Sequence, residues 1–207
     1  MKKGFFLSFE GIDGCGKSTQ VRLLQKALER KGFCVHTIRE PGGSRIGKQL
    51  RKLLLDPQNG SITSKTEAAL YIACMGQNVT EKVIPALKKG CVVIADRFFD
   101  STRAFQGGAR GIPLSFLNRL KHLLVSPIEP QITFLIDIPA KIGVPRSRKR
   151  DKGGDRIEKE SIHHHEKARK SFLKLARQFP RRIHVLDGRL SIDKIHKEVM
   201  KVMNRRL

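Results

Sequence analysis

Apolar residues along this chain fall into short and long runs that alternate. Five short runs are almost continuously apolar, as strands buried on both faces of a parallel sheet are. The predicted strands are residues 5–9, 34–38, 91–95, 132–136 and 183–186. The longer runs have the spacing of apolar positions that is typical of amphipathic helices. The predicted helices are residues 17–31, 46–55, 65–88, 113–124, 159–178 and 192–206.

This alternation predicts an α/β fold, with a five-stranded parallel sheet and helices on both of its faces. The 207 residues suffice for one well-filled core and are short for two, and no repeat or low-complexity linker divides them. We therefore expect a single domain over residues 1–207. Residues 146–156 are too polar for a core, so a flexible lid is expected at about 143–158.

The chain carries a formal net charge of +23 at pH 7. Such a charge favours anionic partners, either small phosphates or nucleic acid. Lys and Arg are spread along the whole chain, however, and the aromatic residues, 6% of the total, do not interleave with them as a base-stacking surface requires. Most of these charges are therefore expected to lie on the solvated surface, and a nucleic-acid partner is not expected.

Two features bear on the compartment. No apolar run approaches the roughly 20 residues of a membrane span, and the apolar start reaches Glu10 too soon for a signal peptide. Cys15, Cys34, Cys74 and Cys91 are scattered and form no C-x-x-C pair, so neither a zinc site nor a disulfide framework is expected. We therefore expect no membrane association and a reducing, cytoplasmic environment.

One segment matches the phosphate-binding motif G-x-x-x-x-G-K-[ST] in full, between a predicted strand and a predicted helix. Its glycines let backbone N–H groups curve around a phosphate at the helix N-terminus. Lys17 can reach the β- and γ-phosphates, and the Ser18 hydroxyl can bind Mg²⁺. The motif predicts a P-loop NTPase fold that binds a nucleoside triphosphate with Mg²⁺, but it does not identify the reaction. The expected nucleotide-binding residues are Gly11, Ile12, Asp13, Gly14, Cys15, Gly16, Lys17, Ser18 and Thr19.

Four further stretches, together with Phe9-Glu10-Gly11, show in their order a resemblance to bacterial thymidylate kinases. They are Arg39-Glu40-Pro41-Gly42-Gly43, Asp96-Arg97-Phe98, Asp100-Ser101-Thr102-Arg103-Ala104-Phe105-Gln106-Gly107-Gly108 and Asp155-Arg156-Ile157-Glu158. The resemblance implies a kinase that transfers the γ-phosphate of ATP to dTMP, giving dTDP for dTTP synthesis. It also implies a homodimer.

The resemblance assigns roles at the reacting phosphates. Asp96 ends a predicted strand on the usual ligand side of a parallel sheet, where it and Ser18 can hold Mg²⁺. Arg97 is placed to clamp the acceptor phosphate against the donor, which two approaching anions require. Asp13 matches an acidic residue that faces the acceptor, although it could also only stiffen the loop.

The same resemblance places the acceptor nucleotide. Arg39 and Arg51 match positions near its phosphate, although Arg51 could equally be the polar side of a helix, and Glu40 could be a structural hydrogen-bond partner. Tyr71 matches an aromatic residue stacked on thymine, and otherwise suits a core position. The remaining implied contacts are Gln106 and Thr102 with the base and its surroundings and Phe105 under the deoxyribose.

One departure concerns the base. The family usually has an arginine four residues after the stacking aromatic, and this chain has Met75 there. A thioether cannot donate a hydrogen bond to the thymine carbonyl. A pyrimidine monophosphate kinase of broader specificity, acting on dUMP or UMP, is therefore the alternative to a dTMP kinase, and a nucleic-acid-binding NTPase is a more distant one.

A second departure concerns the catalytic arginine. Some members carry it in the phosphate loop, where this chain has Gly14, and others supply it from the lid. The lid here holds Arg146, Arg148, Arg150 and Arg156. The chain thus resembles the lid-arginine subtype. Any of Arg146, Arg148 and Arg150 could reach the γ-phosphate, and Arg148 and Arg150 are the favoured candidates, unless the run of charges is only a solvated surface. Such an arginine acts on lid closure, as charge develops on the transferred group.

Overall fold

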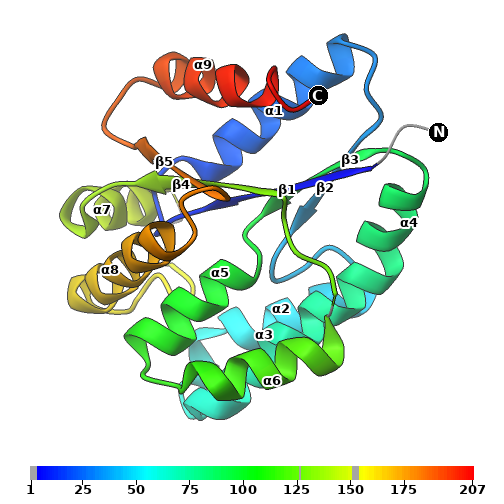
Figure 1. Cartoon of the computed structure of the whole chain (residues 1–207). Coiled ribbons are helices and arrows are strands. Elements are labelled where there is room, and N and C mark those ends of the chain that lie inside the picture. The colour runs from blue at the N-terminus through cyan, green and yellow to red at the C-terminus, as the bar shows by residue number, and fades with distance from the viewer. Residues whose placement is uncertain (1–3, 126, 151–153) are drawn as a thin grey trace.

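The computed structural model describes residues 4–125, 127–150 and 154–207, with the side chain of residue 150 left out. Five parallel strands form one sheet in the order β2-β3-β1-β4-β5 (Figure 1). Each strand lies within one residue of its predicted position, so the predicted sheet is confirmed. The strands are β1 (Phe5–Glu10), β2 (Val35–Arg39), β3 (Val92–Asp96), β4 (Ile132–Asp137) and β5 (Ile183–Asp187).

Helices cover both faces of the sheet, as predicted. On one face lie α1 (Lys17–Arg30) and α9 (Ile192–Met203); the opposite face carries α3 (Ser64–Asn78) and α6 (Leu114–Leu124), among others (Figure 1). Buried side chains form two apolar clusters, one of which joins α1, α8 (Ile162–Gln178) and α9 to the sheet. None of the helices in the described ranges is long and apolar enough to cross a membrane.

The helix predicted over residues 65–88 is interrupted. It consists of α3, a π-helical turn η2 (Val79–Val83) and α4 (Ile84–Lys88). Pro85 stands at the start of α4. Proline has no N–H for the carbonyl four residues earlier, and its ring crowds that carbonyl, so the preceding turn widens.

Several short helices were not predicted from the pattern of apolar residues. After β2 come α2 (Arg45–Leu55) and the 3₁₀ turn η1 (Pro57–Asn59), of which only α2 was expected. After β3 the chain coils into α5 (Phe99–Thr102) and the π-helical η3 (Arg103–Ala109). These segments bury polar side chains such as Asp100 and Gln106, so their sequence does not have an amphipathic pattern.

The segment expected to be a polar flap is partly helical. Helix α7 (Ala140–Arg150) buries Val144 and Ser147 on one side, three residues apart. Residues 151–153 lie outside the described part of the chain. After them, Glu158 is buried again and accepts a hydrogen bond from Ser147 at 2.5 Å. Polar residues of the predicted lid are therefore packed inside it, where they pair with one another.

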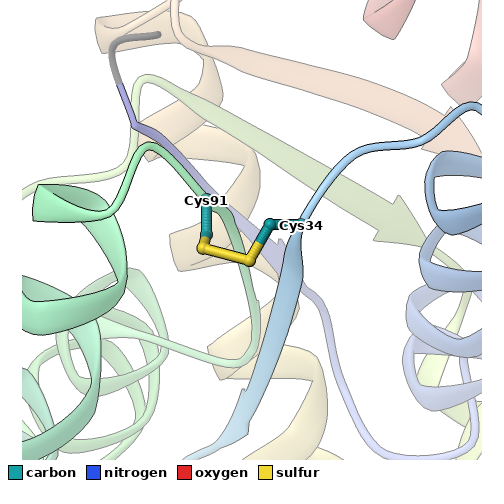
Figure 2. Close-up of a disulfide and its surroundings, with 2 residues drawn as sticks. All are labelled: Cys34 and Cys91. Atoms are coloured by element: carbon teal, nitrogen blue, oxygen red, sulfur yellow. A yellow bond between two sulfur atoms is a disulfide. The ribbon is translucent and has the colours of Figure 1, made fainter. Parts of the chain in front are cut away.

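The expectation that no disulfide forms is wrong. Cys34 and Cys91 are joined by a disulfide, although 57 residues separate them (Figure 2). The two cysteines stand immediately before β2 and β3, which pair in parallel, so the sheet brings their side chains together. Sequence spacing carries no sign of this pairing, because only the order of strands makes the two residues neighbours. Cys15 and Cys74 carry free thiols.

Helix α7 touches the phosphate loop backbone to backbone. A Cβ atom on Gly14, whose φ is 73°, would lie 1.9 Å from the Gly143 carbonyl oxygen. A Cβ on Gly143 would in turn lie 2.7 Å from the Asp13 carbonyl oxygen. Gly14 is therefore required both for its left-handed backbone and for this close approach. An arginine at this loop position would displace α7.

We predict that Gly14→Ala destabilises the protein more than Gly32→Ala. Both glycines have positive φ, but nothing lies within 4 Å of a Cβ at Gly32. Gly32→Ala is expected to lower the free energy of unfolding by about 1–2 kcal/mol, and Gly14→Ala by about 1–3 kcal/mol more because of overpacking. Urea unfolding of the two variants measures the difference. Equal losses would show that α7 does not rest on the loop.

Candidate active site

A cavity of about 270 Å³ opens where β1, β2 and β3 end. Parallel strands present their carboxyl ends at one edge of a sheet, which is where ligands of such folds bind. Residues far apart in the sequence therefore meet there. Those of the expected site residues that line the cavity are Asp13, Gly14, Gly16, Lys17, Ser18, Thr19, Arg39, Glu40, Arg51, Tyr71, Asp96, Arg97, Thr102, Phe105 and Gln106.

The phosphate loop forms one end of this cavity. Helix α1 begins at Lys17, directly after Gly16, and no side chain among the described residues caps it. Its first N–H groups and the positive end of its dipole are thus available to an anion. The buried Lys17 ammonium donates to the carbonyl oxygens of Gly11 at 3.1 Å and Ile12 at 2.8 Å. Gly11, Ile12 and Cys15 do not line the cavity themselves, but they shape the loop around it.

Two oxygen ligands meet beside the loop. The Ser18 hydroxyl donates to the Asp96 carboxylate at 2.5 Å, so a residue of α1 and the last residue of β3 are in direct contact. Both line the cavity. Hydroxyl and carboxylate oxygens are the donors that Mg²⁺ prefers, together with water and phosphate oxygens. The pair therefore fits the magnesium site that the sequence predicts.

Arg97 lines the cavity next to the phosphate loop. Its φ is 75°, a left-handed conformation that is rare outside glycine and concentrated at functional sites. The guanidinium contacts Asp13 at 2.6 Å, the Gly11 carbonyl at 2.8 Å and the Ser101 hydroxyl at 3.0 Å. Burial works against ionisation of Asp13, but the charges of Arg97 and Lys17 outweigh it and lower the Asp13 pKa to about 2. Asp13 is therefore a fixed anion that holds Arg97 in place.

A second group of cations faces the cavity from β2 and α2. Arg51 donates to the Pro41 carbonyl oxygen at 2.8 Å. Burial, and then repulsion from Arg39, lower the Arg51 pKa. A bound anion would relieve both effects, because it would compensate the two charges. This end of the cavity therefore suits a second phosphate.

Glu40 lies under this cationic end without an arginine partner in the described structure. Its carboxylate accepts a hydrogen bond from the Asn78 amide at 2.6 Å. Burial raises the Glu40 pKa to about 8, although the bond from Asn78 acts in the opposite direction. Asn78 also accepts from the Ser44 N–H at 2.8 Å, which ties α3 to the start of α2. Glu40 thus braces the loop after β2 as well as lining the cavity.

Aromatic and apolar side chains and one amide form another part of the cavity wall. Tyr71 and Met75 line it from α3, one turn apart, and Phe105 lines it from η3. The Gln106 amide nitrogen donates to buried Glu67 at 2.9 Å, which fixes the orientation of the amide. An aromatic ring, a thioether and an oriented amide make a slot for a flat, polar-edged ring.

The arginines of the predicted lid differ in whether their side chains line the cavity or contact other parts of the protein. Arg146 lines the cavity, whereas Arg148 turns to the carbonyl oxygens of Glu158 and Glu160 at 3.3 and 3.0 Å. The side chain of Arg150 lies outside the described part. Arg156 donates to the Leu54 carbonyl oxygen at 2.8 Å and forms an ion pair with Glu67 at 2.6 Å, so it fastens the lid to α2 and α3.

Two buried residues near the phosphate loop were not predicted as site residues, although the Phe9-Glu10-Gly11 stretch that supports the resemblance includes one of them. Glu10 ends β1 and is fully buried, and it accepts from the Phe98 N–H at 2.7 Å and the Ser101 hydroxyl at 2.5 Å. His165 on α8 is also fully buried, and its Nδ1 lies 3.8 Å from the Asp13 carboxylate. Burial lowers the His165 pKa, which favours the neutral ring. A periodic apolar pattern around His165 could have indicated that it faces inward, but not what it faces.

Known proteins resemble the chain along its whole length. The family model "Thymidylate kinase" matches residues 9–199. A thymidylate kinase of Thermoanaerobacter sp. (strain X514) is 40% identical over 205 residues, which cover 99% of this chain and 100% of that protein. One of Citrifermentans bemidjiense is 44% identical over 190 residues, covering 89% and 84% of the two chains.

A solved structure agrees with these sequences. The crystal structure of thymidylate kinase from Ehrlichia chaffeensis superposes with a TM-score of 0.78 at 31% identity, and the match covers 98% of this chain and 99% of that one. The cavity unites a phosphate loop, a hydroxyl and a carboxylate that fit a magnesium ion, and a second cationic end. Sequence, fold and geometry thus agree, and the chain belongs to the thymidylate kinase family.

Proposed function

We propose that this protein transfers the γ-phosphoryl group of ATP to dTMP, giving ADP and dTDP. The observation that carries the proposal is that Lys17 and Arg97 line the same cavity, with the cationic pair of Arg39 and Arg51 in its wall. The loop end is suited to the triphosphate and the cationic end to the acceptor phosphate. The family to which the chain belongs supplies the identity of the acceptor.

The transfer needs little chemistry from the protein beyond placement and charge. An oxygen of the acceptor phosphate forms a bond to the γ-phosphorus while the bond from that phosphorus to the β–γ bridging oxygen breaks, and ADP leaves with the electron pair. The two reactants are both anions, so cations must hold them together. Lys17 serves the donor phosphates and Arg97, positioned by Asp13, serves the acceptor. When it is bound at Ser18 and Asp96, Mg²⁺ supplies further charge neutralisation.

The apolar slot supports a pyrimidine acceptor. Tyr71 provides a face on which the base can stack, and the oriented amide of Gln106 can pair with its edge. Phe105 lies 5.2 Å from the Arg97 guanidinium, which ties the sugar end of the slot to the reacting end. Because Met75 replaces a donor, dUMP is the second candidate acceptor.

The proposal has three further parts. The resemblance to bacterial thymidylate kinases supports a homodimeric assembly, and the sequence features described above support a cytoplasmic location and a single domain over residues 1–207. Of the lid arginines, Arg146 is the best placed to reach the transferred group, because it alone among those with described side chains in α7 lines the cavity.

We expect Lys17→Ala and Arg97→Ala each to lower kcat by about 10²-fold or more, since each removes a cation from the transferred charge. A coupled ADP assay with ATP and dTMP measures this. The matched control is Lys26→Ala, an exposed residue on the same helix as Lys17. Far-ultraviolet circular dichroism should show that all three variants keep the fold. Turnover at the wild-type level in either variant would refute the assignments.

The two lid arginines provide a second test. Arg146→Ala should lower kcat by about 10³-fold or more, as loss of a catalytic arginine does. Arg148→Ala should change it less than tenfold, because Arg148 bonds backbone carbonyls away from the cavity. Single-turnover kinetics at saturating ATP and dTMP separate this effect from weaker binding. The reverse ranking would identify Arg148 as the catalytic arginine.

Base selectivity is tested by kcat/KM for dTMP, dUMP, UMP and CMP. We expect dTMP to be preferred, and Met75→Arg to widen the gap between dTMP and CMP by about 1–3 kcal/mol of transition-state free energy, because it adds a donor for a base carbonyl. Met75→Leu, which changes the side chain without adding a donor, is the control. If dUMP equalled dTMP, the selectivity would be lost and the kinase activity would stand.

A further inference from the structure

A second group of side chains, which could bind a metal ion, lies at the amino ends of the strands, opposite the active site. The active site follows the carboxyl ends of β1, β2 and β3, whereas Cys34 and Cys91 stand immediately before the amino ends of β2 and β3 (Figure 2). His36 is the second residue of β2. One donor atom from each of these three residues lies within 4.8 Å of the other two, which makes them the candidate group for a metal among the described residues.

The register of the sheet builds this group. Val35 pairs with Val92, so Cys34 and Cys91, the residues before them, are direct neighbours across the two strands. The Val92 N–H bonds the Cys34 carbonyl at 2.8 Å, which fixes the two backbones next to the sulfur atoms. Side chains alternate along a strand, so Cys34 and His36 are on the same face. All three side chains thus point to one side of the strand pair.

Exposure makes the group accessible from one direction. Cys34 and His36 are exposed, while Cys91 is 2% exposed. β2 is an edge strand and pairs only with β3 in the described sheet. A small ion can therefore reach Cys34 and His36 from solvent, and the buried Cys91 lies next to them.

The donor set is selective. Two thiolates and one imidazole nitrogen are ligands for zinc-like and softer ions and not for Mg²⁺, which takes oxygen. Donors bound tetrahedrally to one zinc ion are about 3.5–3.8 Å apart, given metal–ligand bonds of about 2.0–2.3 Å. The three donors need only small side-chain movements to reach that spacing once the disulfide opens. Two thiolate charges would balance a divalent ion, and water would fill the fourth position.

We propose that Cys34, His36 and Cys91 form a redox-gated binding site for one zinc-class divalent ion. The disulfide and the metal-bound dithiolate are alternative states of the same pair. A dithiol reductant supplies two electrons and two protons, the sulfur–sulfur bond breaks, and the reductant becomes a disulfide. Zn²⁺ then binds as the two thiols release two protons. In the reverse step, a disulfide oxidant takes two electrons from the thiolates and two protons from solvent and becomes a dithiol, while the bond between Cys34 and Cys91 forms again and the ion is released.

Either state fastens the edge strand. In one state a sulfur–sulfur bond joins the start of β2 to β3, and in the other a metal does so with His36 as a third anchor. The site lies apart from the phosphate loop, and its ligands take no part in the proposed phosphoryl transfer. Its test therefore uses no nucleotide, so its failure and that of the proposed function are distinguishable.

The experiment titrates Zn²⁺ into the reduced full-length chain in competition with a chromophoric chelator, with reductant removed under anaerobic conditions. We expect one equivalent to bind to reduced protein and none to protein with the disulfide intact. Co²⁺ in place of Zn²⁺ should give thiolate-to-cobalt charge-transfer absorption in the near ultraviolet. A large excess of Mg²⁺ should displace neither ion.

Single substitutions identify the ligands. Cys34→Ser should abolish binding and the cobalt absorption. His36→Ala should weaken binding by at least about tenfold, since even residues that only support a ligand cost about 10–100-fold. His36 is exposed, so this variant is expected to fold, and thiol counting should show that its disulfide still forms. Cys74→Ser, which also removes one thiol, is the matched control and should bind as the wild type does.

Three outcomes would overturn the proposal. The reduced wild type could bind no more Zn²⁺ than Cys34→Ser, the oxidised protein could bind as tightly as the reduced one, or His36→Ala could match the wild type. Thermal unfolding curves of each variant confirm that the comparison is between folded proteins.

Discussion

Parallel pairing of β1, β2 and β3 is the constraint on which the active site depends. Each strand ends in a polar residue at the same edge of the sheet: Glu10, Arg39 and Asp96. Next to these strand ends lie the loops that follow the strands, and these loops supply further site residues. Arg97, one residue beyond β3, takes up a left-handed backbone and turns back to Asp13 of the phosphate loop. The order of strands in the sheet therefore determines which charged residues are neighbours, and the turns after the strands determine the orientation of their side chains.

Close backbone contact couples the lid to this arrangement. Gly14 and Gly143 lack the side chains that would separate α7 from the phosphate loop, so the helix that carries Arg146 rests directly on the nucleotide-binding segment. At the C-terminal end of the lid, Arg156 forms an ion pair with Glu67, which also orients Gln106. Close contacts therefore connect the lid to the phosphate loop and, through Glu67, to the amide of Gln106. Movement of α7 without movement of the loop would break this packing.

The cationic side chains of the cavity have protein partners that phosphate oxygens could replace. In the structure, Lys17 is bonded to loop carbonyls, Arg97 to Asp13 and Arg51 to the Pro41 carbonyl. Buried cations must have partners, because an unpaired charge is costly in a medium of low dielectric constant. Phosphate oxygens can replace the neutral carbonyl partners with charged ones. Ligand binding therefore gives anionic partners to cations that folding has already desolvated. Less of the free-energy cost of desolvation then has to be met when the ligand binds.

The sequence by itself determined the five strands, most of the helices, the phosphate loop and the chemistry of the residues around it, because strand burial and phosphate binding leave local patterns. Other features depend on partners distant in the sequence. The order of strands joins Cys34 to Cys91, which spacing argued against. Only the packing of α7 shows that Arg146 faces the cavity and Arg148 does not. A run of basic residues has no periodic pattern that would mark one face of the helix. His165 reaches Asp13 for the same reason: local sequence specifies which residues can turn inward, and the assembled sheet and helices specify what they meet.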